Sequence, residues 1–265
     1  MIEVSDTTSL DLFRLDGKLA LVTGGSGFYG TPISRALAQA GAKVIIASRN
    51  RDNCEARAAE FRKEGLDCVA EQFDMGDPAS ITGLRDRIES EHGVLDILVN
   101  NALQRSPTHY DEATPEQWAA ALQANITGIH LCTSAFSAAM RKRGSGNIIN
   151  IASIYGVVAP NFQIYEGLDF ASPPDYPFHK GGLIAYTRYC ASLFGPDGVR
   201  VNCLSPGGYY SGQAEVFVDR YNARVPLGRM ADDDDIAGPV VFLASEASRY
   251  ITGANILVDG GLTIR

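Results

Sequence analysis

Short runs of apolar residues, rich in valine, isoleucine and leucine, recur along the chain and alternate with segments of helical spacing. Such continuous runs are typical of strands buried on both faces of a parallel sheet. They lie at residues 19–22, 44–47, 95–99, 148–152, 199–204 and 256–258. The alternation predicts an α/β fold, a doubly wound parallel sheet of about seven strands with helices on both faces, as a single domain over residues 1–265. Ligands of such sheets bind outside the carboxyl ends of the strands.

One helix is expected to be unusually long. It begins after Thr114, an N-cap residue followed by Pro115 at the first helical position and by Gln117 at the capping-box position, and it extends to about residue 140. Two segments stand outside the regular alternation. Residues 1–16 form a polar N-terminal extension, and residues 155–175 form a loop longer than a direct strand-to-helix connection needs, which is typical of a lid or specificity element.

Composition narrows the class of partner. The 265 residues carry 23 basic and 31 acidic side chains, a net charge of -8 that opposes nucleic-acid binding and favours a small-molecule partner. The five cysteines show neither disulfide nor zinc-site spacing, so we expect buried thiols and no metal. With no apolar run of about 18 residues and no secretory signal pattern, we expect no membrane span and a cytoplasmic protein.

A glycine-rich turn directly follows the first predicted strand. Residues 23–30 read Thr-Gly-Gly-Ser-Gly-Phe-Tyr-Gly, and a helix with Pro32 in its first turn comes next. Such a turn is sometimes only structural. Between a strand and a helix, however, glycines let the backbone approach a pyrophosphate, and the helix N-terminus favours its charge. The position therefore indicates dinucleotide binding.

The end of the second strand bears on the choice of dinucleotide. NAD is typically bound there by a carboxylate that accepts hydrogen bonds from the adenosine ribose, whereas an arginine suits the 2′-phosphate of NADP. This chain has Ser48, Arg49 and Asn50, with no carboxylate. We therefore expect NADP, with NAD as the alternative and a solvated loop charge as the other interpretation of Arg49.

Several further motifs, taken in order, make the chain resemble the short-chain dehydrogenase/reductase family from residue 17 to residue 261. These motifs are Asn100-Asn101-Ala102, Asn125, Ser153, the Tyr176-x-x-x-Lys180 pair, Pro206-Gly207 and the Val-Asp-Gly-Gly sequence at 258–261. The resemblance implies a Rossmann-type fold and a hydride transfer between nicotinamide and a carbon that bears a hydroxyl or keto group. The relatives that it suggests act on gluconate-like polyols or modify bacterial surface sugars.

The resemblance also implies roles for individual residues. Tyr176 would exchange a proton with the substrate oxygen, Ser153 would hydrogen-bond that oxygen, and Lys180 would hold the nicotinamide ribose, while Asn125 would position a water linked to Lys180. The remaining expected cofactor contacts are Gly24, Ser26, Gly27, Phe28, Tyr29, Gly30, Ser48, Arg49, Asn50, Asp74, Met75, Asn101, Ala102, Pro206, Gly207, Tyr209 and Ser211. A homotetramer built through the helices at about 115–140 and 176–194 is the family's usual assembly.

Electrostatics supports Tyr176 as the proton-transferring residue. A phenol with a pKa near 10 needs a shift of roughly 3 units to exchange protons near neutral pH. A cation about 4 Å from a phenolate stabilises the anion by on the order of 4 kcal/mol at an effective dielectric of 20. We therefore expect Lys180 to lower the pKa of Tyr176. Tyr165 lies nearer the usual family spacing from Ser153, but position 169 is Asp, so Tyr165 lacks a lysine partner.

Two departures from the family pattern stand out. Phe28 occupies a position at which short members usually have glycine, and we expect the flexibility of Gly27 to compensate. The gap between Ser153 and Tyr176 implies an insertion of about ten residues in the 155–175 loop. The glycine turn at 23–30 has the spacing Thr-Gly-x-x-Gly-x-x-Gly, which is typical of the longer epimerases and dehydratases of the family. The chain leaves little room for the C-terminal domain that those enzymes have.

The substrate is expected to be a sugar, sugar acid or polyol, because polar groups in a pocket select hydroxylated ligands. The candidates are Asn161, Gln163, Tyr165, Glu166, Asp169, Tyr209, Tyr210 and Gln213. One alternative is a 3-oxoacyl-thioester reductase, which would have a more apolar entrance. An alternative from another class is a dinucleotide-sensing regulator without turnover, although such proteins commonly lose the Tyr-Lys pair that this chain retains.

Overall fold

The computed structural model describes residues 8–105 and 110–264. Residues 1–7 of the expected N-terminal extension lie outside the described part. From residue 8 onward the extension contains a short 3-10 helix, Asp11–Phe13, before the first strand. Leu15 is fully buried and its backbone N–H bonds to the carbonyl of Ala40, so the end of the extension packs onto the main fold.

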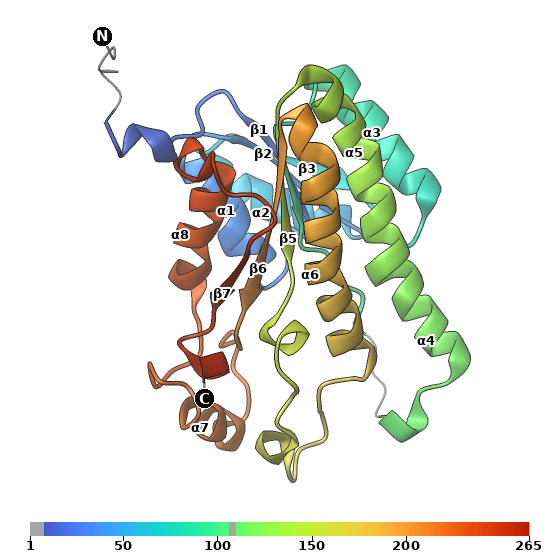
Figure 1. Cartoon of the computed structure of the whole chain (residues 1–265), viewed down its shortest axis with the longest axis vertical. Coiled ribbons are helices and arrows are strands. Elements are labelled where there is room, and N and C mark those ends of the chain that lie inside the picture. Colours follow the sequence, from blue (N-terminus) through green and yellow to red (C-terminus); the bar gives the residue numbers. More distant parts are fainter. Residues whose placement is uncertain (1–7, 106–109, 265) are drawn as a thin grey trace.

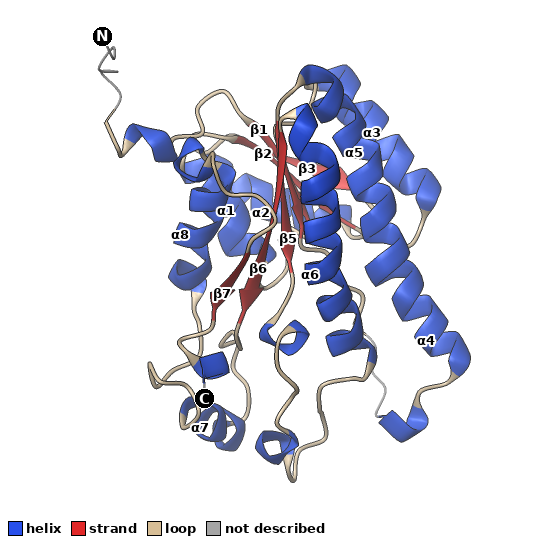
Figure 2. Ribbon diagram, in the orientation of Figure 1, coloured by secondary structure: helices blue, strands red, loops and turns tan. Residues whose placement is uncertain are grey.

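A parallel sheet of seven strands forms the centre of the molecule (Figures 1 and 2). The strand order is β3-β2-β1-β4-β5-β6-β7, which is a doubly wound arrangement with its reversal between β1 and β4. The strands are β1 (Leu19–Thr23), β2 (Lys43–Ser48), β3 (Cys68–Gln72), β4 (Ile97–Asn100), β5 (Gly146–Ile151), β6 (Val199–Pro206) and β7 (Asn255–Val258). The predicted fold class is confirmed.

The strand β3 is absent from the apolar runs of the sequence for a physical reason. It lies at one edge of the sheet, where Glu71 and Gln72 are not buried. An edge strand needs fewer apolar residues than a central one, because part of it faces water. The central strand β1, by contrast, is buried at all five positions.

Helices cover both faces of the sheet (Figure 2). Residues of α1 (Gly30–Gln39), α2 (Arg51–Lys63) and α8 (Asp233–Ala244) share one buried apolar cluster with the sheet. Residues of α3 (Pro78–Glu91), α5 (Ile129–Arg143) and α6 (Asp175–Phe194) share the other. The sheet is therefore the middle of three layers, and its strands must be apolar on both sides.

The long helix predicted from residue 115 is present, but it is not uniform. It begins as α4 (Pro115–Leu122) with the predicted capping box of Thr114 and Gln117. A π-helical segment, Gln123–Gly128, then joins it to α5. Such π turns are rare and occur frequently at functional sites. Here the segment contains Asn125.

A third, smaller apolar cluster lies beyond the carboxyl edge of the sheet. It joins Ile164 of the 155–175 loop to Phe217 and Tyr221 of α7 (Glu215–Asn222). Figure 1 shows this loop and α7 at the same end of the molecule, below the ends of β5 and β6. The inserted loop is thus docked against α7.

Two expectations came from the composition, one about the cysteines and one about membrane-spanning helices. All five cysteines are buried and free, as predicted. Among the described helices, none combines the length and the apolar character needed to cross a membrane.

Candidate active site

Two adjoining cavities lie at the carboxyl ends of the strands. The larger, of about 460 Å³, is lined by the glycine turn, by the ends of β4 to β6 and by residues of α6 and α7. The smaller, of about 230 Å³, shares Gly24, Ser48 and Ala102 with it and continues toward Arg49 and Asp74. Their position is where a doubly wound sheet binds its ligands.

The glycine turn is shaped by close backbone contacts. Gly24 has a φ of 65°, a left-handed conformation, and a Cβ there would lie 2.9 Å from the Cα of Ala102. At Gly30, the first residue of α1, a Cβ would lie 2.0 Å from the carbonyl oxygen of Gly24. The turn therefore folds back onto the start of α1 only because these positions lack side chains, which leaves the N-terminus of α1 open to the cavity.

The expectation that Gly27 compensates for Phe28 is wrong. Gly27 does not have a positive φ, and among the described residues no residue other than glycine has one. The turn needs the left-handed conformation at Gly24 instead. Phe28 accordingly fits without strain, with 53% of its surface exposed, and the guanidinium of Arg105 lies 5.1 Å from its ring centroid.

Hydrogen bonds fix the neighbouring strand end to this turn. The Thr23 hydroxyl donates to the carbonyl of Val99 and accepts from the backbone N–H groups of Asn101 and Ala102, at 3.0 and 3.1 Å. The Asn101 side-chain amide donates to the carbonyls of Thr23 and Gly24. The Asn101-Ala102 motif thus holds the cavity wall next to the glycine turn.

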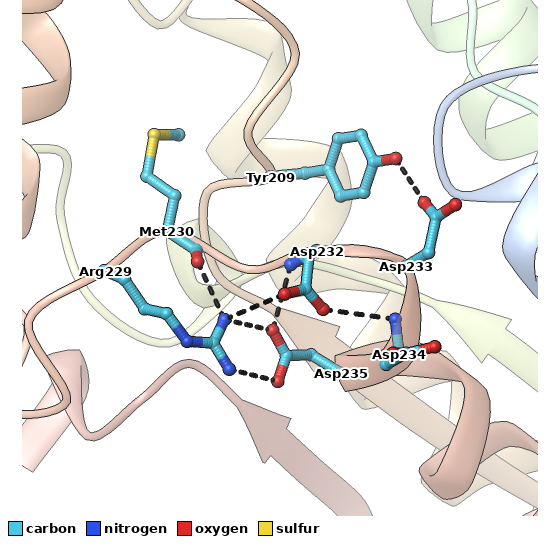
Figure 3. Close-up of polar contacts among 7 residues, drawn as sticks. All are labelled: Tyr209, Arg229, Met230, Asp232, Asp233, Asp234 and Asp235. Atoms are coloured by element: carbon cyan, nitrogen blue, oxygen red, sulfur yellow. Dashed lines mark hydrogen bonds and ion pairs between the residues drawn. The ribbon is translucent and has the colours of Figure 1, made fainter.

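An aromatic contact links the same turn to the loop after β6. The Tyr29 hydroxyl donates to the carbonyl of Gly207 at 2.8 Å, and the rings of Tyr29 and Tyr209 lie 4.9 Å apart. Tyr209 in turn donates to Asp233 at the start of α8 (Figure 3). Because the tyrosine is thereby held as a donor to a carboxylate, its pKa rises to about 12.

The acidic run at 232–235 forms the start of α8. Asp232 and Asp235 form a capping box, and Arg229 binds Asp235 through two hydrogen bonds of 2.5 and 2.8 Å (Figure 3). The hydrogen bonds from Arg229 lower the pKa of Asp235 to about 2. These contacts anchor the segment that carries Met230, another residue of the larger cavity.

Ser153, Tyr176 and Lys180 converge on the wall of the larger cavity. Ser153 follows β5, whereas Tyr176 and Lys180 lie one turn apart near the start of α6. The Lys180 ammonium donates to the carbonyl of Ile151 at 2.7 Å and lies 5.6 Å from the centroid of the Tyr176 ring. Tyr176 and Lys180 thus share a helix face, as predicted, and that face points at the cavity.

The predicted lowering of the Tyr176 pKa is wrong for the protein on its own. Loss of surrounding water raises the pKa of Tyr176, although a hydrogen bond with Ser153 and the charge of Arg105 oppose the rise. Burial also lowers the pKa of Lys180 to about 8. Both shifts have the same cause, since a low-dielectric site disfavours whichever form carries charge.

Asn125 does not line either cavity. Its side-chain amide exchanges two hydrogen bonds of 2.9 Å with the backbone of Gln104, donating to the carbonyl and accepting from the N–H. The adjacent residues Leu103 and Arg105 line the larger cavity. The direct effect of Asn125 is therefore to hold this segment of the wall in place.

Most of the expected site residues lie around the two cavities. The larger is lined by Gly24, Ser26, Gly27, Phe28, Tyr29, Ser48, Asn101, Ala102, Ser153, Tyr176, Lys180, Pro206, Gly207, Tyr209 and Ser211. The smaller adds Arg49, Asn50, Asp74 and Met75. Gly30 and Asn125 line neither cavity. Gly30 packs against Gly24 of the glycine turn, and Asn125 hydrogen-bonds to Gln104, between two residues of the cavity wall.

The expected polar lining of the substrate region is only partly present. Tyr165, Tyr209 and Gln213 line the larger cavity, whereas Asn161, Gln163, Glu166, Asp169 and Tyr210 do not. Asn161, for example, caps the short helix Phe162–Tyr165 by accepting from the N–H of Gln163. Loop residues often satisfy their own backbone in this way, so their polarity says little about a ligand.

Sequence reasoning missed several residues of the larger cavity. These are Leu103, Arg105, Ile151, Ala152, Ile154, Tyr155, Gly208, Phe217, Tyr221 and Met230. Arg105 follows the Asn-Asn-Ala motif by three residues and Tyr155 follows Ser153 by two, so proximity to these motifs was the available signal. Phe217, Tyr221 and Met230 come from α7 and the segment after it, whose docking no local pattern reveals.

Known proteins share this architecture. The family model described as enoyl-(acyl carrier protein) reductase matches residues 29–263. Gluconate 5-dehydrogenase of Gluconobacter oxydans is 31% identical over 262 residues, covering 96% of this chain and 98% of its own. D-threitol dehydrogenase of Mycolicibacterium smegmatis is 33% identical over 263 residues, covering 96% and 95%. The crystal structure of a gluconate 5-dehydrogenase from Burkholderia cenocepacia, in complex with NADP and tartrate, has 32% identity and a TM-score of 0.89, covering 97% of this chain and all of that one.

The fold and the site define a single-domain α/β oxidoreductase. The chain belongs to the short-chain dehydrogenase/reductase family, as its motifs indicated.

Proposed function

We propose that the protein is an NAD(P)-dependent oxidoreductase that interconverts a secondary alcohol and a ketone on a small hydroxylated substrate. The observation that carries this proposal is the meeting of Ser153, Tyr176 and Lys180 with the glycine turn around one cavity. The proton-transferring groups and the dinucleotide site must share a cavity for a hydride and a proton to be exchanged with the same substrate.

The chain's own residues fit a dinucleotide. The turn at Gly24 and Gly30 exposes the N-terminus of α1 for a pyrophosphate, and the smaller cavity, lined by Asp74 and Met75, would take the adenosine. When bound, the nicotinamide accepts or donates the hydride. Lys180 would hold its ribose, and Pro206, Gly207, Tyr209 and Ser211 would face its ring.

NADP is the proposed form of the cofactor. Arg49 lines the smaller cavity, and none of the ion pairs among the described residues uses its guanidinium. Ser48 and Asn50 flank it without adding negative charge. An arginine that is not neutralised by a carboxylate is suited to a 2′-phosphate.

Tyr176 is the proposed proton donor and acceptor at the substrate oxygen. Because its pKa is raised in the protein alone, the phenol is protonated at neutral pH, which is the form that donates to a carbonyl oxygen during reduction. Ser153 would hydrogen-bond the same oxygen. Asn125 supports the site by holding the 103–105 wall, and its link to a water near Lys180 remains part of the proposal.

The substrate is proposed to be a sugar, sugar acid or polyol. The gluconate and threitol dehydrogenases among the relatives support this class. So do the exposed cation of Arg105, which suits a carboxylate, and the tyrosine hydroxyls of the larger cavity. A 3-oxoacyl-thioester reductase remains the second candidate, because Phe217 and Met230 add apolar surface to the same cavity.

We also propose a cytoplasmic homotetramer. Apolar side chains on α6 support association through this helix, since Phe178, Tyr189 and Leu193 expose 58%, 65% and 47% of their surface. Exposed apolar groups gathered on one long helix are typical of an interface between protomers.

The proposed function is tested by a cofactor-reduction screen of sugar acids, polyols and secondary alcohols, with NAD and NADP in parallel and acetoacetyl thioesters in the reverse direction. Turnover of a hydroxylated substrate, faster with NADP, is expected. Preferential turnover of the thioester would favour the second candidate. Tight NADPH binding without turnover of any compound would indicate a dinucleotide sensor and contradict the proposal.

A further inference from the structure

Two tyrosine hydroxyls meet in the wall of the larger cavity. The hydroxyl oxygens of Tyr155 and Tyr165 lie 2.8 Å apart, and both residues line the cavity together with Tyr176. Tyr155 comes from the short helix Ile154–Gly156 that follows β5, and Tyr165 comes from the inserted loop. The hydrogen bond therefore joins the inserted part of the loop to the turn after β5, which carries Ser153.

The insertion holds Tyr165 firmly. Its ring centroid lies 5.5 Å from that of Phe217 in α7 and 5.9 Å from that of Phe170. The carbonyl of Glu166, the next residue, accepts a 2.6 Å hydrogen bond from Arg220 of α7. A recognition group that is fixed by packing and hydrogen bonds loses little conformational freedom when a ligand binds.

The pair lies beside the proposed proton-transferring residue. The rings of Tyr155 and Tyr176 are perpendicular, with centroids 6.4 Å apart. Tyr155 also donates its backbone N–H to the hydroxyl oxygen of Ser153 at 3.2 Å. A substrate whose oxygen reaches Ser153 and Tyr176 would thus bring its next atoms close to the tyrosine pair.

The pair can both donate and accept. Each hydroxyl has one proton and two lone pairs, and the bond between them uses one proton and one lone pair. One proton and several lone pairs remain for a ligand. Burial raises the pKa of both tyrosines, so the pair is uncharged. An uncharged group that donates and accepts matches a hydroxyl better than it matches a carboxylate or a phosphate.

We infer that Tyr155 and Tyr165 recognise a second hydroxyl of the substrate, close to the carbon that reacts at Tyr176. The insertion would then select diols, such as sugars and polyols, over alcohols with a single hydroxyl. This inference rests on the proposed function, because it assumes that the substrate oxygen binds at Ser153 and Tyr176. It adds two specificity residues, one of which the insertion supplies.

The test compares substrates that differ only in the second hydroxyl. The kcat/KM values for 2,3-butanediol and 2-butanol, and for 1,2-cyclohexanediol and cyclohexanol, are measured at saturating NADP. The wild-type protein is expected to prefer each diol by about tenfold, the effect of one hydrogen bond of ordinary strength. Tyr155→Phe and Tyr165→Phe are expected to bring this ratio close to one. Tyr210→Phe is the matched control, since Tyr210 is exposed and lies outside the cavity wall, and it should keep the wild-type ratio.

A binding measurement separates this inference from the proposed function. Calorimetry with NADP-saturated protein compares D-threitol with 1,4-butanediol, which has the same carbon chain and lacks the two inner hydroxyls. Turnover of no alcohol would contradict the proposed function, whereas tighter binding of threitol that is lost in Tyr165→Phe would still support the tyrosine pair. The inference is wrong if the wild-type protein shows no preference for threitol, or if either phenylalanine variant, shown by its melting temperature to be folded, keeps that preference.

Discussion

The ammonium group of Lys180 donates a 2.7 Å hydrogen bond to the carbonyl oxygen of Ile151, the last residue of β5. Both residues are buried. Since Ser153 lies two residues beyond Ile151 and Tyr176 lies one turn before Lys180, this bond ties together the two elements that carry the proposed proton-transferring groups. Lys180 therefore holds β5 and α6 together at the site, in addition to placing a positive charge there.

Burial of Lys180 predicts a dependence of stability on pH. Its pKa is near 8 in the folded protein and 10.5 without the shift. Below about pH 8 both states are protonated, and the folded state bears the full cost of a buried charge. Between pH 8 and 10.5 the unfolded state binds more protons, so the free energy of unfolding rises with pH, by about 3 kcal/mol over the whole window.

Urea unfolding of the wild-type protein and of Lys180→Met between pH 7 and 10 measures this effect, because contributions common to both proteins cancel in the difference. The wild-type protein should gain stability relative to the variant as pH rises. A constant difference across this range would show that Lys180 titrates with an ordinary pKa.

Arg49 is expected to determine the cofactor preference. Arg49→Ala removes the cation from the smaller cavity, and a charge-assisted hydrogen bond contributes about 1.5–3 kcal/mol. The kcat/KM for NADP should fall by about 10- to 100-fold while that for NAD changes little. Arg51→Ala is the control, because Arg51 lies two positions further on, at the start of α2, and does not line that cavity. Equal effects of the two substitutions on NADP would argue against a specific phosphate contact.

Gly30 is expected to tolerate no side chain. In Gly30→Ala the new Cβ would lie 2.0 Å from the carbonyl oxygen of Gly24, so the glycine turn or α1 must shift. Such overpacking costs about 1–3 kcal/mol, and NADPH binding, followed by fluorescence titration, should weaken with it.

Gly83→Ala is the control for Gly30→Ala, because it adds the same methyl group to a helix where there is room for it. Gly83 lies inside α3, where a Cβ would meet only the end of the Arg87 side chain at 3.4 Å. This substitution should raise the free energy of unfolding by about 0.5–1 kcal/mol. Unchanged NADPH binding in Gly30→Ala would show that the close contact does not shape the cofactor site.

The sequence predicted the fold well because its signals are local and repeated. Six of the seven strands are apolar runs, and the capping box at Thr114 marks the start of the long helix. The π-helical segment was not predicted, and neither was the contact that its residue Asn125 makes with Gln104, more than twenty positions earlier, because no local pattern marks either.

The candidate site was predicted where motifs carry it and missed where tertiary packing does. Ser153, Tyr176 and Lys180 line one cavity, as the family resemblance implied. The predicted direction of the Tyr176 pKa shift is wrong, because the largest effect on this phenol is the loss of surrounding water, which also lowers the pKa of Lys180. Tyr165, which has no lysine partner, lines the cavity as a candidate substrate contact, because its loop docks on α7.

Tyr176→Phe tests whether Tyr176 exchanges the proton with the substrate. The measurement is kcat on the best substrate of the screen, alongside NADPH binding by fluorescence titration. Tyr250→Phe is the control, because Tyr250 is fully exposed and lines neither cavity. The proposed role predicts that kcat falls by at least about 100-fold in Tyr176→Phe while NADPH binding persists and the control keeps its activity. Turnover near the wild-type rate in Tyr176→Phe would contradict it.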